Sequence, residues 1–241
     1  MDQNFFNYYL DKVDSTNIKI KKISEQKSNE ENIALLAYNQ TSGRGRSKNY
    51  WISNYGDLTC SFLIKKKIEV DKLGQINILI SVAIIEALKK IFPNLKIKIK
   101  WPNDLYVENK KIGGILLESQ INKNLVNYLI IGLGINIVTS PIIEKYETTK
   151  ISNYTENTDL KKIFHLVRDH IYKNICIWDK KNFKFFKTKW ISFSKDVGGT
   201  VSIKKNNNFY TGNFMTINEN GELVMNTKEK KNISFSFGEI V

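Results

Sequence analysis

The chain has 241 residues, of which 41% are hydrophobic and 25% charged, and only three are proline. This composition excludes collagen-like, proline-rich and disordered proteins, and the length predicts one large domain or one domain with a small appendage. The formal net charge of +13, from 37 Lys+Arg against 24 Asp+Glu, is typical of proteins that bind nucleic acid, anionic membranes or acidic partners. Only three of these basic residues are arginine, so we interpret most of the excess as a solvated lysine coat.

Neither the cysteines nor the hydropathy pattern indicates a secreted or membrane protein. Cys60 and Cys176 form no CxxC motif and lie in apolar stretches, so we expect two buried thiols in a reducing compartment. The first residues lack a basic segment followed by an apolar run, and no apolar segment reaches the ~18 residues of a membrane span. We therefore expect a cytoplasmic protein that does not bind a membrane.

The first half of the chain alternates strand and helix patterns. An apolar run over 32–38 and an alternating pattern over 58–64 predict two strands, joined by a polar, glycine-rich loop over 40–51. Apolar residues at steps of three and four predict a helix over 71–92. Alternation over 95–101 then predicts a strand with one buried and one solvated face.

A meander of antiparallel strands should follow. Residues 104–107 and 111–120 predict a hairpin around a short turn, and a second turn leads into a strand over 126–138. Two amphipathic patterns then predict helices over 160–178 and 183–193.

The pattern at the end of the chain predicts a small β module. After Gly198 the pattern changes to short strands over 200–203, 209–217 and 222–225, with a tight-turn signal at Asn220-Gly221. We place the boundary near Ser194, which predicts domains over 1–193 and 194–241.

Two of the three arginines, Arg44 and Arg46, lie in one glycine-containing loop. The planar guanidinium offers a bidentate grip on phosphate or carboxylate that an ammonium lacks. Gly43 and Gly45 allow the backbone N–H groups to approach an anion closely. The alternative is an ordinary surface loop with two solvated arginines.

The hairpin carries a second candidate group. If 104–107 pairs with 111–117, Asp104 and Lys111 come close together, which positions a lysine at a sheet surface. Gly113 and Gly114 within a strand indicate a bulge or a ligand pressed against the backbone. The alternative is an exposed hairpin with incidental lysines, which is the better interpretation of Lys110.

Two further segments are ambiguous by themselves. Gly132 and Gly134 interrupt a strong strand, either to make room for a small apolar ligand or as a plain bulge. No third glycine and no helix follow, so this is not a dinucleotide-binding fingerprint. The hydroxyls of Ser15 and Thr16 open a helical stretch, where such residues usually serve only as N-caps.

Together these segments resemble the biotin protein ligase family, also called biotin–[acetyl-CoA-carboxylase] ligase or holocarboxylase synthetase. The motifs occur in the family's order and spacing over roughly the first 140 residues: Asp14-Ser15-Thr16-Asn17, Gly43-Arg44-Gly45-Arg46 with Trp51, Lys100-Trp101-Pro102-Asn103-Asp104, Lys111-Ile112-Gly113-Gly114-Ile115-Leu116 and Gly132-Leu133-Gly134-Ile135-Asn136.

The resemblance implies an α+β fold. Its catalytic domain would be a class II aminoacyl-tRNA synthetase-like mixed sheet flanked by helices, which we expect on one side, followed by a C-terminal SH3-like β-barrel. It also implies that biotin and ATP form biotinyl-5′-AMP, with Mg²⁺ on the ATP, and that biotin passes to a lysine of the biotin carboxyl carrier of acetyl-CoA carboxylase or a related enzyme. Because the first motif begins at residue 15, we expect no N-terminal DNA-binding domain and no DNA partner.

The resemblance also assigns roles. The implied catalytic residues are Lys111, Arg44 and Arg46. The implied biotin-binding residues are Ser15, Thr16, Asn17, Gln40, Gly43, Arg44, Gly114, Gly132 and Gly134. The implied ATP- and adenylate-binding residues are Arg44, Gly45, Arg46, Trp51, Asn103, Asp104, Lys111 and Asn136. Metal ligands are not assigned. The loop over 41–50 is expected to close over the ligand as a lid.

Two alternatives remain open. A lipoate or octanoate ligase or transferase would share the architecture, although the arginine loop and the Trp-Pro-Asn-Asp segment favour biotin. A basic nucleic-acid-binding protein is the alternative from another class. A homodimer is possible, since an exposed strand could pair with a carrier hairpin or with a second copy.

Overall fold

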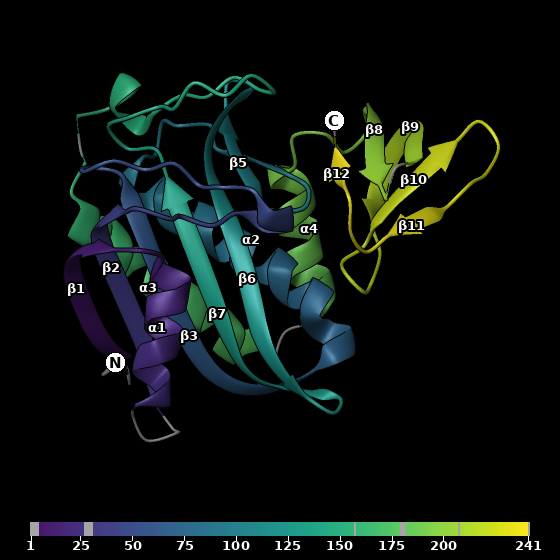
Figure 1. The fold of residues 1–241 in the computed structure, drawn as a ribbon. Coiled ribbons are helices and arrows are strands. Elements are labelled where there is room, and N and C mark those ends of the chain that lie inside the picture. Colours follow the sequence, from purple (N-terminus) through teal and green to yellow (C-terminus); the bar gives the residue numbers. More distant parts are fainter. Residues whose placement is uncertain (1–4, 27–30, 157, 179–181, 207, 241) are drawn as a thin grey trace.

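A seven-stranded sheet forms the centre of the computed structural model, which describes residues 5–26, 31–156, 158–178, 182–206 and 208–240 (Figure 1). The strand order is β1-β2-β3-β7-β6-β5-β4. The strands are β1 (Phe5–Val13), β2 (Asn32–Gln40), β3 (Leu58–Glu69), β4 (Lys98–Lys100), β5 (Asp104–Val107), β6 (Lys110–Asn122) and β7 (Leu125–Ile135).

Most of this sheet is the antiparallel meander predicted from the sequence. Strands β3, β7, β6, β5 and β4 pair antiparallel in that spatial order, and β4 is shorter than the predicted strand over 95–101. Strand β1 was not predicted, and it pairs parallel with β2, which makes the sheet mixed. Only the two ends of β1 are buried, so its sequence carries no alternating apolar pattern.

Helices cover both faces of the sheet. They are α1 (Thr16–Glu25), α2 (Leu73–Ile91), α3 (Leu160–Trp178) and α4 (Phe183–Phe193). The predicted helices over 71–92, 160–178 and 183–193 are confirmed, and a short 3₁₀ turn precedes α2. Figure 1 shows α1 on the opposite side of the sheet from α2 and α3. The expectation that all helices lie on one side is therefore wrong.

The alternation of β2 explains these two layers. Ala34 and Leu36 belong to the main core cluster beneath α2 and α3, whereas Ile33 and Leu35 belong to a smaller cluster with Ile20 of α1. Successive strand residues point to opposite faces, so a strand covered on both sides reads as a continuous apolar run. That is the pattern observed over 32–38.

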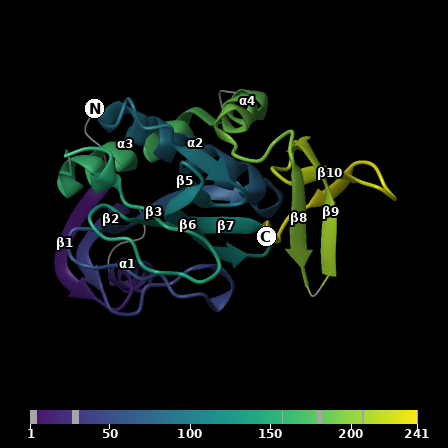
Figure 2. The same cartoon turned by 90° about the horizontal axis from the view of Figure 1, so that it is seen from above.

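The C-terminal residues form a separate antiparallel sheet with strand order β11-β10-β9-β8-β12. Its strands are β8 (Thr200–Lys205), β9 (Asn208–Ile217), β10 (Leu223–Thr227), β11 (Ile233–Phe235) and β12 (Glu239–Ile240). Figure 2 shows it beside the central sheet and next to α4. The expected C-terminal β module is thus present. Its Phe214 and Ile217 share one core cluster with Trp190 of α4, and the division near Ser194 remains a prediction.

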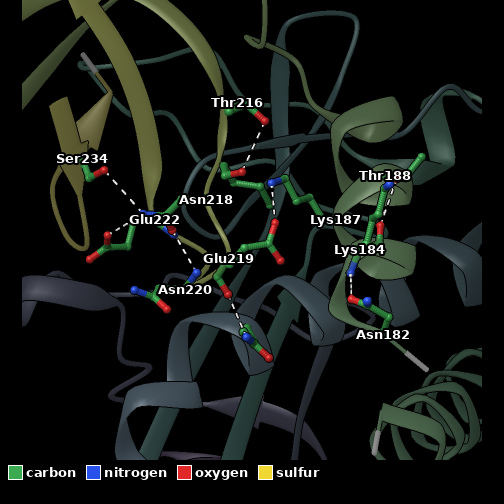
Figure 3. A network of polar contacts seen from close by, with 12 residues as sticks. Asn182, Lys184, Lys187, Thr188, Thr216, Asn218, Glu219, Asn220, Glu222 and Ser234 are labelled. Carbon is green, nitrogen blue, oxygen red and sulfur yellow. Dashed lines mark hydrogen bonds and ion pairs between the residues drawn. The ribbon is translucent and has the colours of Figure 1, made fainter. Parts of the chain in front are cut away.

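The turn between β9 and β10 attaches this sheet to the helices (Figure 3). The Asn218 side chain accepts hydrogen bonds from the N–H groups of Asn220 and Glu222, both at 3.0 Å, which fixes the shape of the turn. Gln75 at the start of α2 donates from Nε2 to the carbonyl of Glu219 at 2.7 Å. Lys187 of α4 lies 2.8 Å from the Glu219 carboxylate.

Replacing Gly221 in this turn with alanine should destabilise the protein by about 2 kcal/mol or more, because of backbone strain and overlap. Gly221 has φ +77°, and an added Cβ would lie 2.4 Å from the carbonyl oxygen of Gly74. Lys187→Ala removes the ion pair with Glu219, whose side chain is 68% exposed, and should cost at most about 1 kcal/mol. Urea unfolding measures both; equal effects would contradict the close backbone contact.

The cysteine expectation is half correct. Cys60 on β3 is buried, and burial raises the pKa of its thiol. Cys176 is exposed, because it follows Ile175 on α3 and falls off the buried face of that helix. No helix in the described part of the chain is long and apolar enough to span a membrane.

Candidate functional site

Most of the predicted site residues converge on one cavity of about 840 Å³ over β6 and β7. The predicted residues that line it are Ser15, Thr16, Asn17, Gln40, Arg44, Gly45, Arg46, Trp51, Asn103, Asp104, Lys111, Gly114, Gly132 and Gly134. Arg44, Arg46 and Lys111, the three cations predicted to act together, therefore share one hollow. Gly43 and Asn136 are outside the lining.

Lys111 is held in place from two sides. Its Nζ lies 2.8 Å from Oδ2 of Asp104 on the paired strand β5, and its side chain is only 12% exposed. The ring centroid of Tyr146 lies 4.8 Å from the same Nζ. The Lys111 backbone N–H donates to the carbonyl of Glu147 at 2.9 Å, so a loop after β7 is tied to the strand that carries the amine.

The two arginines lie on a closed loop, residues 43–51, which we call the arginine flap. Its ends are joined by the Trp51 N–H donating to the Gly43 carbonyl at 2.9 Å. Arg44 Nη2 lies 3.1 Å from Oε1 of Glu118 on β6, and Arg46 Nη1 donates to Oδ1 of Asn103 at 3.2 Å. Each guanidinium is thus connected to the sheet below.

Arg46 is the more buried of the two arginines. Desolvation by burial lowers the pKa of its guanidinium, while the negative charges of Asp104 and Glu239 oppose that shift. The group remains charged near neutral pH because the starting pKa of arginine is so high. The cavity therefore holds a partly desolvated cation, which attracts an anion more strongly than a cation in water.

The side chains of Asn103 and Asn136 both donate hydrogen bonds to backbone carbonyl groups. Asn103 Nδ2 donates to the carbonyl of Ile115 at 2.6 Å, and the Ile115 N–H donates back to the Asn103 carbonyl at 3.0 Å. Asn103 therefore presents its Oδ1 to Arg46 from a fixed position. Asn136 donates to the carbonyl of Thr149 at 3.1 Å, and its buried Oδ1 has no hydrogen-bond partner within the described residues.

The hydroxyl groups at the start of α1 are not used as helix caps. Ser15 occupies the N-cap position, but its side chain makes no capping hydrogen bond. The N–H and Oγ1 of Thr16 both donate to Oε1 of Gln40, at 2.8 and 2.9 Å. Because Gln40 Oε1 accepts both hydrogen bonds, the amide nitrogen of Gln40 is the group that can donate to a ligand.

The glycines on β7 make room for protein side chains. A Cβ at Gly134 would lie 2.3 Å from Cε2 of Trp51, so the indole rests directly on the strand. A Cβ at Gly132 would lie 2.4 Å from Oδ1 of Asn17. Gly134 and Gly132 thus accommodate Trp51 and Asn17 and also line the cavity, and their role in making room for the ligand remains a prediction. The space beside Gly114 is more open, with Asp104 Oδ1 nearest at 3.4 Å.

Sequence reasoning missed two walls of the cavity. The additional lining residues include Ile142, Ile143, Glu144, Lys145 and Tyr146 after β7, and Lys204, Asn206, Phe237, Gly238, Glu239 and Ile240 of the C-terminal sheet. The first segment has no periodic pattern and its Ile142 is 99% exposed. The second is far away in the sequence, and only the docked C-terminal sheet brings it to the cavity.

The described residues offer no dedicated metal centre. Among them, no group of three or more His, Cys, Asp and Glu side chains is arranged to hold a metal ion. Asp104, the carboxylate nearest the predicted catalytic amine, already pairs with Lys111. A Mg²⁺ ion would fit this cavity as part of a Mg·ATP substrate, held mainly by the phosphate oxygens.

Comparison with known proteins agrees with the motifs. Residues 9–136 match the Biotin/lipoate A/B protein ligase family. The structure resembles biotin protein ligase from Aquifex aeolicus in complex with biotin and ATP, with a TM-score of 0.82 and 31% identity over 100% of this chain and 98% of that one.

Two curated relatives have different lengths. The biotin–[acetyl-CoA-carboxylase] ligase of Paracoccus denitrificans is 24% identical over 90% of this chain and 92% of its own. The bifunctional ligase/repressor BirA of Bacillus subtilis is 27% identical over 83% of this chain, which spans only 63% of that relative. The family match over more than half of the sequence and the full-length structural match place this chain in the biotin protein ligase family.

Proposed function

We propose that this protein activates biotin with Mg·ATP to give biotinyl-5′-AMP and pyrophosphate, and then transfers biotin to a lysine of a carboxylase carrier domain. The observation that carries the proposal is the meeting of Arg44, Arg46 and Lys111 in one cavity. Three cations in one partly closed hollow suit a reaction between two anions.

In the first step the biotin carboxylate attacks the α-phosphorus of ATP. A carboxylate–phosphorus bond forms, and the bond from the α-phosphorus to the bridging oxygen of pyrophosphate breaks. Two like unit charges 4 Å apart repel by about 4 kcal/mol at an effective dielectric near 20, so cations must offset this repulsion. Lys111 would lie between the carboxylate and the α-phosphate, where charge changes in the transition state.

The two ends of the cavity would bind the two substrates. Ser15 and the Gln40 amide supply donors and acceptors for the ureido ring of biotin, beside the floor of β7. Arg46 and Trp51 would face the nucleotide, with the guanidinium on phosphate and the indole available for stacking. Asn103 would support this end by holding Arg46.

In the second step the amine of the carrier lysine attacks the acyl carbon and AMP leaves. The mixed anhydride must be kept from water until the carrier arrives, which is the role we propose for the arginine flap. The net charge of +13 would steer an acidic carrier domain toward the protein. Transfer to a carrier of acetyl-CoA carboxylase or a related enzyme and a cytoplasmic location remain predictions.

Detection of biotinyl-adenylate tests this proposal most directly. Pure protein mixed with biotin and Mg·ATP should release pyrophosphate and hold one equivalent of adenylate, because no carrier is present to discharge it. Lipoate or octanoate in place of biotin should give neither product. Pyrophosphate release with lipoate alone would favour the alternative ligase. A salt-sensitive gel shift with duplex DNA, without adenylate formation, would instead favour nucleic-acid binding.

A further inference from the structure

Glu118 on β6 lies between two parts of the site, and the sequence analysis assigned it no role. Its Oε1 is 3.1 Å from Arg44 Nη2 on the arginine flap, and its Oε2 accepts from Asn17 Nδ2 at 2.7 Å. The Glu118 side chain is one-third exposed. One side chain of the sheet thus connects the flap with the start of α1.

The contact to Asn17 is rigidly built. A carboxylate can only accept, so the Asn17 amide nitrogen must face Glu118 and its oxygen must face the other way. That oxygen accepts from the Ser61 hydroxyl at 2.6 Å. The whole amide lies against Gly132, where an added Cβ would be 2.4–3.1 Å from the oxygen, carbon and nitrogen of the Asn17 amide. The Asn17 amide that donates to Glu118 is therefore fixed in position, and it holds the Glu118 carboxylate.

The contact to Arg44 is the flexible one. The Arg44 side chain is 47% exposed, and ordering such a long side chain costs conformational entropy. Glu118 contacts Nη2, and a guanidinium has five N–H donors in all, so Arg44 has further donors for a second carboxylate. Arg44 can therefore keep its contact with Glu118 while it binds substrate.

We propose that Glu118 is a positioning residue that holds the Arg44 guanidinium over the cavity before biotin binds. Glu118 itself touches no reacting atom. The proposal rests on the proposed function, in which Arg44, an implied biotin-binding residue that lines the cavity, would bind the biotin carboxylate. The competing explanation is an incidental surface ion pair, which contributes nothing measurable in many proteins.

Glu118→Gln separates these explanations, with Glu147→Gln as the matched control. The glutamine keeps the volume and can still accept from Asn17, but it turns N–H groups toward the guanidinium. Glu147 pairs with Lys110 at 3.4 Å and lies outside the cavity, so it reports the loss of one surface charge. Hydrogen exchange over residues 43–51 of the ligand-free protein and the KM for biotin are the two readouts.

We expect Glu118→Gln to accelerate exchange in the flap and to raise the KM for biotin about fivefold, with kcat nearly unchanged. In an Arg44→Ala background the same replacement should have no further effect on biotin KM. A KM effect that persists there would identify a merely structural role and overturn the proposal. So would flap exchange equal to that of Glu147→Gln. The exchange readout needs no substrate, so it stays informative even if biotin is not the substrate.

Discussion

Lys111→Ala should lower the rate of biotinyl-adenylate formation by at least about 100-fold, the loss typical when one preorganised electrostatic group is removed from an active site. The amine is nearly buried in the cavity and is oriented by Asp104 at 2.8 Å. The guanidinium groups of Arg44 and Arg46 contact Glu118 and Asn103 instead, so neither is held at the position of the Lys111 amine.

The variant should still fold. Asp104 loses its partner but is more than one-quarter exposed, so water can solvate its carboxylate. Lys110→Ala is the matched control, because the neighbouring lysine pairs with Glu147 outside the cavity and should leave adenylate formation unchanged. Single-turnover pyrophosphate release measures both rates. Near-normal release by Lys111→Ala, with an unchanged unfolding midpoint, would remove Lys111 from the proposed mechanism.

The parts of the fold and site that depend on local patterns could be predicted. The helix predicted over 71–92 could be recognised because its apolar residues recur at helical steps over five turns. Asp104 and Lys111 come together because a short turn determines the hairpin register. The two arginines are two residues apart in one loop, so a ligand of one lies near the other.

The parts that depend on distant contacts could not be predicted. Strand β1 is recognisable only through its parallel pairing with β2, since its exposed middle lacks an apolar pattern. Gly132 and Gly134 carry the same signal whether a ligand or a side chain presses on them, and only the folded chain identifies Asn17 and Trp51 as the occupants. The wall at 237–240 depends on how the C-terminal sheet docks.

The packing of Trp51 on β7 leads to the second large expected effect. Gly134→Ala should destabilise the protein by about 1–3 kcal/mol, the usual cost of overpacking a filled site. The added Cβ would lie 2.3–2.7 Å from three atoms of the indole, on a strand paired on both sides. Because β7 cannot move, the indole must leave its place, which would also open the nucleotide end of the proposed site.

A double-mutant cycle with Trp51→Ala tests the cause. If the collision with the indole is responsible, Gly134→Ala should cost far less stability in the Trp51→Ala background, because the coupling between touching residues is large. Urea unfolding measures this without reference to activity. ATP affinity should fall in the Gly134→Ala single variant, because the indole is no longer available for stacking. Additive stability losses would mean that the strand itself, rather than Trp51, requires glycine at this position.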